Sequence, residues 1–136
     1  MQLNPYLIFS GNCEAAFRLY ERCLNGKIVA MVKHADTPAA PHVAAEWGSK
    51  IMHAVLESPA GALMGSDRPS GDYEQPKGFS VALHVDDPAE AERVFGALAE
   101  NGSVQMPLQQ TFWATRFGML VDQFGIPWMI NCATGS

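Results

Sequence analysis

The residues of this sequence best suited to acid–base chemistry are His53, Glu57 and Asp67. His53 and Glu57 lie four residues apart in an apolar run, so in an extended strand both side chains point to one face. There His53 can serve as a general base, with Glu57 or Asp67 orienting its ring. A histidine that is hydrogen-bonded or exposed to water is the alternative. No Ser-His-Asp order, activated cysteine or close carboxylate pair supports a specific reaction.

The other three histidines have less defined surroundings. His34 and His42 lie in or beside the loop "HADTPAAPH" and are predicted to be solvated. His84 alternates with apolar neighbours and so shares a strand face with Ser80. If the apolar neighbours pack under a helix, His84 points towards a cavity or its rim.

Three aromatic residues crowd the segment "QQTFWATRFGML" (109–120), namely Phe112, Trp113 and Phe117. Their polar neighbours are typical of a turn, so we predict that Trp113 or Phe117 forms a wall of a ligand cavity. Packing in the core or in a dimer interface is the alternative for both. The polar side chains that we predict to line the same cavity are His53, Asp67, Ser80, His84, Thr111, Arg116 and Asn131.

Three of these assignments have a structural alternative. Asp67, in "GSDRP", can serve as a turn residue. Arg116 can equally be a surface charge or the partner of a carboxylate. Trp128, outside the candidate set, alternates with Met129 and is predicted to pack under a helix.

An internal repeat positions these residues. The segments "CEAAFRLYERCLNGKIV" and "AEAERVFGALAENGSVQ", which begin at Cys13 and Ala89, match at an offset of 76 residues (89 minus 13). Each half reads as a strand, a helix, an Asn-Gly stop and three further strands, which gives the order βαβββ twice. The later strands are predicted at Lys27–Lys33, Ile51–Ser58, Ala62–Ser66, Ser103–Leu108, Thr115–Val121 and Pro127–Cys132. The predicted helix caps are Asn12 and Asp87, the latter followed by Pro88.

The composition limits the class of protein. The chain has 136 residues, 48% of them hydrophobic, and a net charge of −5, which fits one globular domain and argues against a nucleic-acid-binding surface. No apolar run is long enough to span a membrane, and the sequence begins without the pattern of a signal peptide. Three cysteines without a C-x-x-C pair are predicted to be buried and reduced, as in a cytoplasmic protein.

The doubled βαβββ order resembles the vicinal oxygen chelate superfamily, which includes glyoxalase I, bleomycin-resistance proteins and extradiol dioxygenases. The segments "PYLIFSGNCEAAF", "IMHAVLE", "LMGSD", "TFWATRFGMLVDQFG" and "PWMINC" are similar to its PhnB-like branch. The resemblance implies an α+β fold in which two modules form a curled mixed sheet around a shared cavity, and it implies a homodimer. Module one is expected at about 1–67, a linker at about 68–77 and module two at about 78–136.

The resemblance also implies where a metal would be bound. The four ligand positions of metal-dependent relatives fall on Pro5, on or next to Ser80, near Met64, and on Met129 or Asn131. Proline, serine and methionine do not hold a divalent first-row metal, so we predict neither a metal nor another cofactor. A relocated site formed by His53, Glu57 and His84 is the alternative.

The sequence therefore predicts a metal-independent protein that binds a small molecule in an aromatic-walled cavity, without fixing whether it is an enzyme. The alternatives are a lyase, isomerase or dioxygenase with a relocated metal, which would polarise paired substrate oxygens, and a cofactor-free enzyme that uses His53. The ubiquinone methyltransferase activity ascribed to members of this branch lacks support, because no glycine-rich turn follows the first strand.

Overall fold

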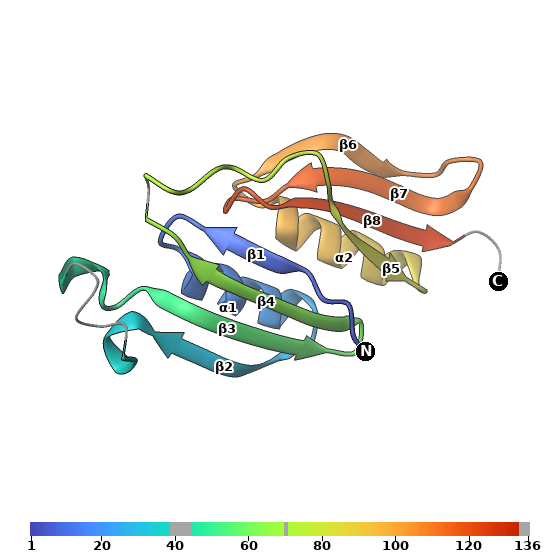
Figure 1. Ribbon diagram of the computed structural model, residues 1–136. Helices are drawn as coiled ribbons and strands as arrows, with labels where there is room; N and C mark the ends of the chain where they lie inside the picture. Colours follow the sequence, from blue (N-terminus) through green and yellow to red (C-terminus); the bar gives the residue numbers. More distant parts are fainter. Residues whose placement is uncertain (39–44, 70, 134–136) are drawn as a thin grey trace. The chain divides into compact units, whose positions relative to one another are not determined.

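The computed structural model describes residues 1–38, 45–69 and 71–133, which form two compact units, Met1–Glu74 and Gln75–Ser136 (Figure 1). The first unit contains β1 (Tyr6–Phe9), α1 (Cys13–Cys23), β2 (Lys27–Lys33), β3 (Ile51–Ser58) and β4 (Gly61–Asp67). The second contains β5 (Val81–Val85), α2 (Pro88–Ala99), β6 (Ser103–Gln109), β7 (Ala114–Val121) and β8 (Pro127–Ala133). The boundary between the units falls within the predicted linker, and His42 lies outside the described residues.

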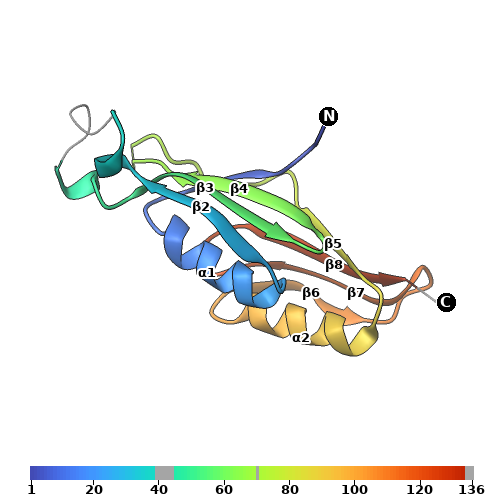
Figure 2. The same ribbon diagram turned by 90° about the horizontal axis from the view of Figure 1, so that it is seen from below.

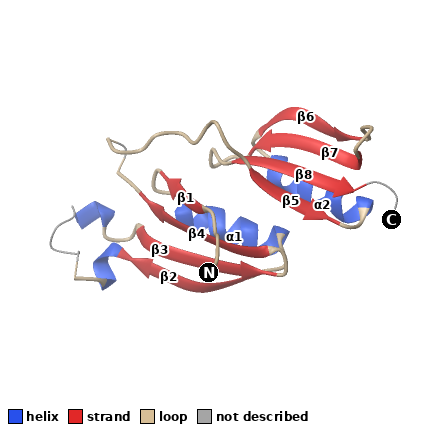
Figure 3. Ribbon diagram, turned by 45° about the vertical axis from the view of Figure 1, so that its right-hand side comes forward, coloured by secondary structure: helices blue, strands red, loops and turns tan. Residues whose placement is uncertain are grey.

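The two units repeat one topology. The strand orders are β1-β4-β3-β2 and β5-β8-β7-β6, and in each sheet the first strand pairs in parallel with the last. In each unit one helix covers one face of its own sheet (Figures 2 and 3). The predicted α+β class and the doubled βαβββ order are confirmed. The cavity shared by the two modules stays a prediction.

The two helices begin differently. Asp87 caps α2 as predicted, because its carboxylate accepts the backbone N–H of Glu90 at 3.1 Å and proline follows it. The prediction that Asn12 caps α1 with its side chain is wrong. The carboxylate of Asp67, at the end of β4, caps the start of α1 instead, because its Oδ1 accepts the backbone N–H of Cys13 at 2.9 Å.

The two Asn-Gly stops are confirmed. Asn25 and Asn101 adopt left-handed backbone conformations, with φ of 53° and 59°. The glycines that follow are required by close packing against the sheet. A Cβ atom on Gly26 would lie 2.7 Å from the carbonyl oxygen of Glu57, and one on Gly102 would lie 2.4 Å from that of Val121.

Each core lies between the helix and its sheet. In the first unit Phe9, Phe17 and Tyr20 are fully buried and their rings contact one another. In the second unit Trp128 is buried, as predicted, and donates its indole N–H to Asp122 at 2.9 Å. The three predicted buried cysteines, at 13, 23 and 132, are buried and free.

Two glycines identify the helix-facing side of each sheet. A Cβ atom on Gly65 would meet the ring of Phe17 in α1, and one on Gly118 would meet the ring of Phe95 in α2. Side chains alternate along a strand, so the residues on either side of these glycines point away from the helix. We call this second side the open face of each sheet.

Candidate functional site

The open face of the second sheet brings together several residues that the sequence predicted for a cavity. Strand pairing aligns Met119 with Met129 and Phe117 with Asn131. The parallel pairing of β5 with β8 adds Ala82 beside Met129 and His84 beside Asn131. These six residues define the open face, while their neighbours Leu83, Leu120 and Ile130 are buried on the side of α2.

A pocket of about 540 Å³ occupies one end of this face. Its floor is apolar and comes from adjacent strands: Met119, Val121, Pro127 and Met129. The segment 75–80 forms another wall, where Phe79 is about half exposed and Ser80 lines the pocket. Phe79 and the residues of the floor were not predicted as ligand contacts. Methionine pairs of this kind suit an adaptable apolar surface, because the side chain is flexible and polarisable.

The aromatic cluster lies at the other end of β7. The ring of Trp113 contacts Phe112 at a centroid distance of 4.7 Å and Phe117 at 5.4 Å, both edge to face. Phe112 is 93% exposed and Trp113 is 47% exposed, so Trp113 does not pack in the core. Thr111 closes the loop before them, since its hydroxyl oxygen accepts the backbone N–H of Ala114 at 3.1 Å.

A polar pair lies between the pocket and the aromatic cluster on the same face. Asn131 Nδ2 and His84 Nδ1 are 3.2 Å apart, within hydrogen-bond distance. Both residues were predicted from sequence to face a cavity. Their amide and imidazole can orient the polar end of a ligand that covers the apolar part of the face.

Arg116 does not belong to this face. It pairs with the buried Cys132, and its guanidinium donates to Glu92 of α2 at 3.2 Å. The structure thus places it in the salt-bridge role that the sequence left open as an alternative.

His53 and Asp67 lie in the first unit. His53 stacks on Tyr6 at a centroid distance of 6.0 Å, with Nδ1 3.5 Å from the phenol oxygen. The Asp67 carboxylate is buried and accepts backbone N–H groups from Gly11, Cys13 and Ile51 at 2.9–3.0 Å. The hydrogen-bond partner that the structure gives His53 is therefore a phenol, and Asp67 holds three separate segments together.

The side chains at the family's metal positions do not fit a divalent metal. Met64 and Met129 lie at matching places in the two sheets, paired with Tyr6 and Ala82. Within the described ranges, no three His, Cys, Asp or Glu side chains gather as metal ligands. The buried thiol of Cys13 also makes a poor ligand, because burial and the nearby carboxylates of Asp67 and Glu14 raise its pKa well above the ordinary value.

Two units that repeat one topology, each a four-stranded sheet covered on one face by a helix, are typical of a glyoxalase-like protein. The family model of the Glyoxalase/Bleomycin resistance protein/Dioxygenase superfamily matches residues 2–130, and the chain belongs to this superfamily. In the described part of the chain, no helix is long and apolar enough to cross a membrane.

Individual relatives agree with this assignment. The chain is 36% identical to Protein YjdN of Escherichia coli K12 over 140 residues, which cover 96% of this chain and 95% of YjdN. The crystal structure of protein PA1353 from Pseudomonas aeruginosa is 52% identical, with a TM-score of 0.89 and 98% of both chains covered. The PhnB protein from Bacillus cereus shares the fold at 21% identity, with a TM-score of 0.82 and coverage of 98% and 100%. The predicted membership of the glyoxalase and bleomycin-resistance superfamily is confirmed, and the fold is shared with a PhnB protein.

Proposed function

We propose that the open face of the second sheet binds a small, largely apolar or aromatic molecule without a resident metal. The observation that carries the proposal is the Met119–Met129 floor of the pocket, which continues through Asn131 and His84 to Phe117 and Trp113. A volume of about 540 Å³ falls in the range of small-molecule sites. The mixture of an apolar floor with few polar groups is also typical of such sites.

The roles of the predicted residues differ along the face. Met119 and Met129 contribute contact area, and Trp113 and Phe117 supply aromatic edges for a ring. His84 and Asn131 orient a hydroxyl or carbonyl group of the ligand. Ser80 lies at the rim beside Phe79. Thr111 fixes the loop that carries the aromatic residues.

The experiment is isothermal titration of the purified protein with 1-naphthol, a neutral aromatic probe that carries one hydroxyl group. Met129→Ala and Trp113→Ala should each weaken binding by about 5- to 30-fold, because truncation of a side chain that contacts the ligand costs on the order of 1–2 kcal/mol. The matched control is Val29→Ala, an exposed apolar residue of the first unit. Equal affinity of all three variants and the parent would refute the proposal.

A cytoplasmic homodimer belongs to the same proposal. The free, buried cysteines suit a reducing compartment, and the exposed Phe112 provides apolar surface for a second copy. Light scattering during size exclusion should give twice the subunit mass. Phe112→Ser should shift the protein towards the monomer if this residue lies in the interface rather than over a ligand.

A further inference from the structure

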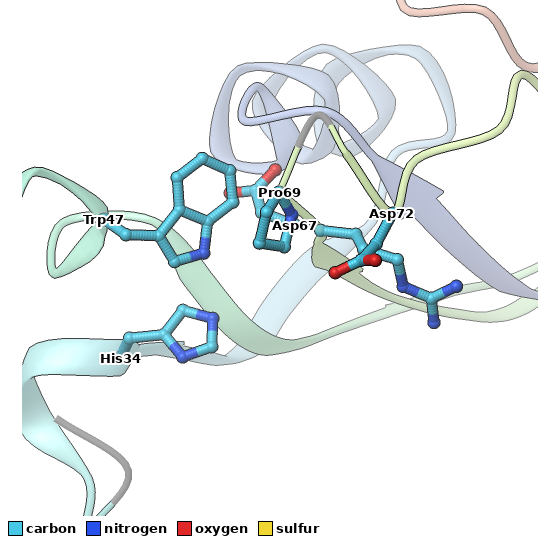
Figure 4. A pocket seen from close by; sticks show the side chains of 6 residues that line it. His34, Trp47, Asp67, Pro69 and Asp72 are labelled. Carbon is cyan, nitrogen blue, oxygen red and sulfur yellow. The ribbon is translucent and has the colours of Figure 1, made fainter. Parts of the chain in front are cut away.

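The first unit contains a separate pocket at one end of its sheet. It lies beside the short 3-10 turns η1 (His34–Asp36) and η3 (Ala45–Trp47) and has a volume of about 550 Å³. Its lining residues, shown in Figure 4, are His34, Trp47, Asp67, Arg68, Pro69 and Asp72. None of them belongs to the open face of the second sheet.

Two of these residues carry buried polar atoms without partners. Both ring nitrogens of His34 and Nε1 of Trp47 are shielded from solvent and have no hydrogen-bond partner among the described residues. The prediction that His34 is solvated is therefore wrong. Such atoms are normally satisfied in a folded protein, so each one needs an explanation.

The chemistry of these atoms specifies what would satisfy them. An indole N–H can only donate, and an imidazole carries at least one N–H in every protonation state. Figure 4 shows the indole of Trp47 and the ring of His34 bordering the same opening. A group with two acceptor oxygens complements the indole N–H and one N–H of His34, which accounts for two of the three unpartnered nitrogens.

The charged side chains and the apolar walls of this pocket limit further which class of ligand can bind. Both oxygens of Asp67 already accept backbone N–H groups, and Arg68 adds a positive charge to the lining. Asp72 is exposed at the rim. The faces of Trp47 and Pro69 supply flat apolar walls.

We propose that this pocket binds a small planar carboxylate. One carboxylate oxygen accepts from Trp47 Nε1–H, an N–H of His34 donates to the other, and the flat body of the ligand packs against Pro69. This pocket shares no lining residue with the proposed small-molecule site in the second unit.

The three tryptophans allow a direct test by two-dimensional NMR of their indole ¹⁵N–H groups during titration with sodium benzoate. The Trp47 signal, assigned with Trp47→Phe, should move downfield and saturate. The Trp128 signal should stay in place, because its N–H is bonded to Asp122. The Trp113 signal reports separately on the second unit. A Trp47 signal that benzoate leaves unmoved would refute the site.

Two comparisons test the chemistry of the site. His34→Phe should weaken benzoate binding at least fivefold, whereas His34→Gln, which keeps an N–H donor, should lose less. Benzamide, the same size as benzoate but uncharged, should bind at least fivefold more weakly. Equal binding by benzamide, or an unchanged affinity of His34→Phe with native-like Trp113 and Trp128 signals, would overturn the assignment of a carboxylate.

Discussion

The open faces of the two sheets are built on one register but present different surfaces. In the first sheet Tyr6 lies beside Met64, and its ring reaches across the face to stack on His53. In the second sheet Ala82 takes the place of Tyr6 beside Met129. A protein aromatic ring therefore lies across part of the first face, whereas the equivalent position of the second face holds only the small side chain of Ala82. We propose that this one difference at equivalent positions makes the open face of the second sheet, and not that of the first, suited to a ligand.

The buried aspartates should show the largest difference between the halves. Asp67 joins β4 to the start of α1 and the start of β3, whereas Asp122 bonds two backbone N–H groups within its own turn and Trp128. Asp67→Ala should lower the free energy of unfolding by about 3–5 kcal/mol, because three N–H donors lose their acceptor. Asp122→Ala should cost roughly 2–3 kcal/mol, since its turn can relax towards water. Urea unfolding measures both, and a smaller loss for Asp67→Ala would contradict this account.

The glycines under the helices should be equivalent in the two halves. A Cβ atom would lie 2.9 Å from the Phe17 ring at Gly65 and 2.6 Å from the Phe95 ring at Gly118. Gly65→Ala and Gly118→Ala should each destabilise the protein by about 1–3 kcal/mol through overpacking. The control is Gly96→Ala on the exposed side of α2, where a Cβ atom meets nothing within 4 Å. That change should raise stability by roughly 0.5–1 kcal/mol in thermal unfolding, and a loss would argue against the helix boundaries.

The contrast between Tyr6 and Ala82 predicts an effect on binding. Ala82→Tyr should place an aromatic ring on the open face beside Met129, as Tyr6 does beside Met64, and it should weaken 1-naphthol binding about tenfold, or about 1.4 kcal/mol. Ala82→Ser, which keeps the side chain small, should leave the affinity within about twofold, well under 1.4 kcal/mol. Calorimetric titration of both variants with 1-naphthol measures these affinities. Unchanged binding by Ala82→Tyr would place the ligand elsewhere.

The helix stops should give the smallest effect and the closest match between halves. Asn25→Ala and Asn101→Ala should each cost about 1 kcal/mol, because alanine tolerates the left-handed conformation poorly. Replacing either asparagine with glycine should be nearly neutral. Chemical unfolding of the four variants provides the measurement. Losses that differ by more than about 1 kcal/mol between the two alanine variants would show that the repeat is not energetically equivalent there.

Local signals in the sequence were sufficient for the repeat. Asn25 and Asn101 stop the helices because their preference for left-handed backbone is a property of the residue itself, and Asp87 caps α2 three residues from its donor. The cap of α1 could not be predicted locally, because its acceptor is Asp67, 54 residues from Cys13. The cap of α1 thus depends on a contact between residues far apart in the sequence, which a local pattern cannot predict.

The part of the candidate site that depends on the alternation of side chains along a single strand could be predicted from the sequence. His84 and Ser80 were placed on one face by that rule, and continuing it from Phe117 would have added Met119. The contrast between Tyr6 and Ala82 depends on the pairing of β1 with β4 and of β5 with β8, which local pattern does not reveal. The unpartnered nitrogens of His34 and Trp47 depend on the packing of two short turns, for which the sequence has no periodic signal.

Methyl NMR of protein labelled with ¹³C at the methionine methyl groups tests directly whether a ligand binds on the open face of the second sheet. The seven methionines include Met119 and Met129 on the proposed binding face and Met1, which is fully exposed. On titration with 1-naphthol, ring currents should move the methyl signals of Met119 and Met129 along one saturable curve, while Met1 stays in place. The signal of Met64 reports in the same spectra on the matching face of the first sheet. If the Met119 and Met129 signals do not move while the probe binds, the ligand site is not on the open face of the second sheet.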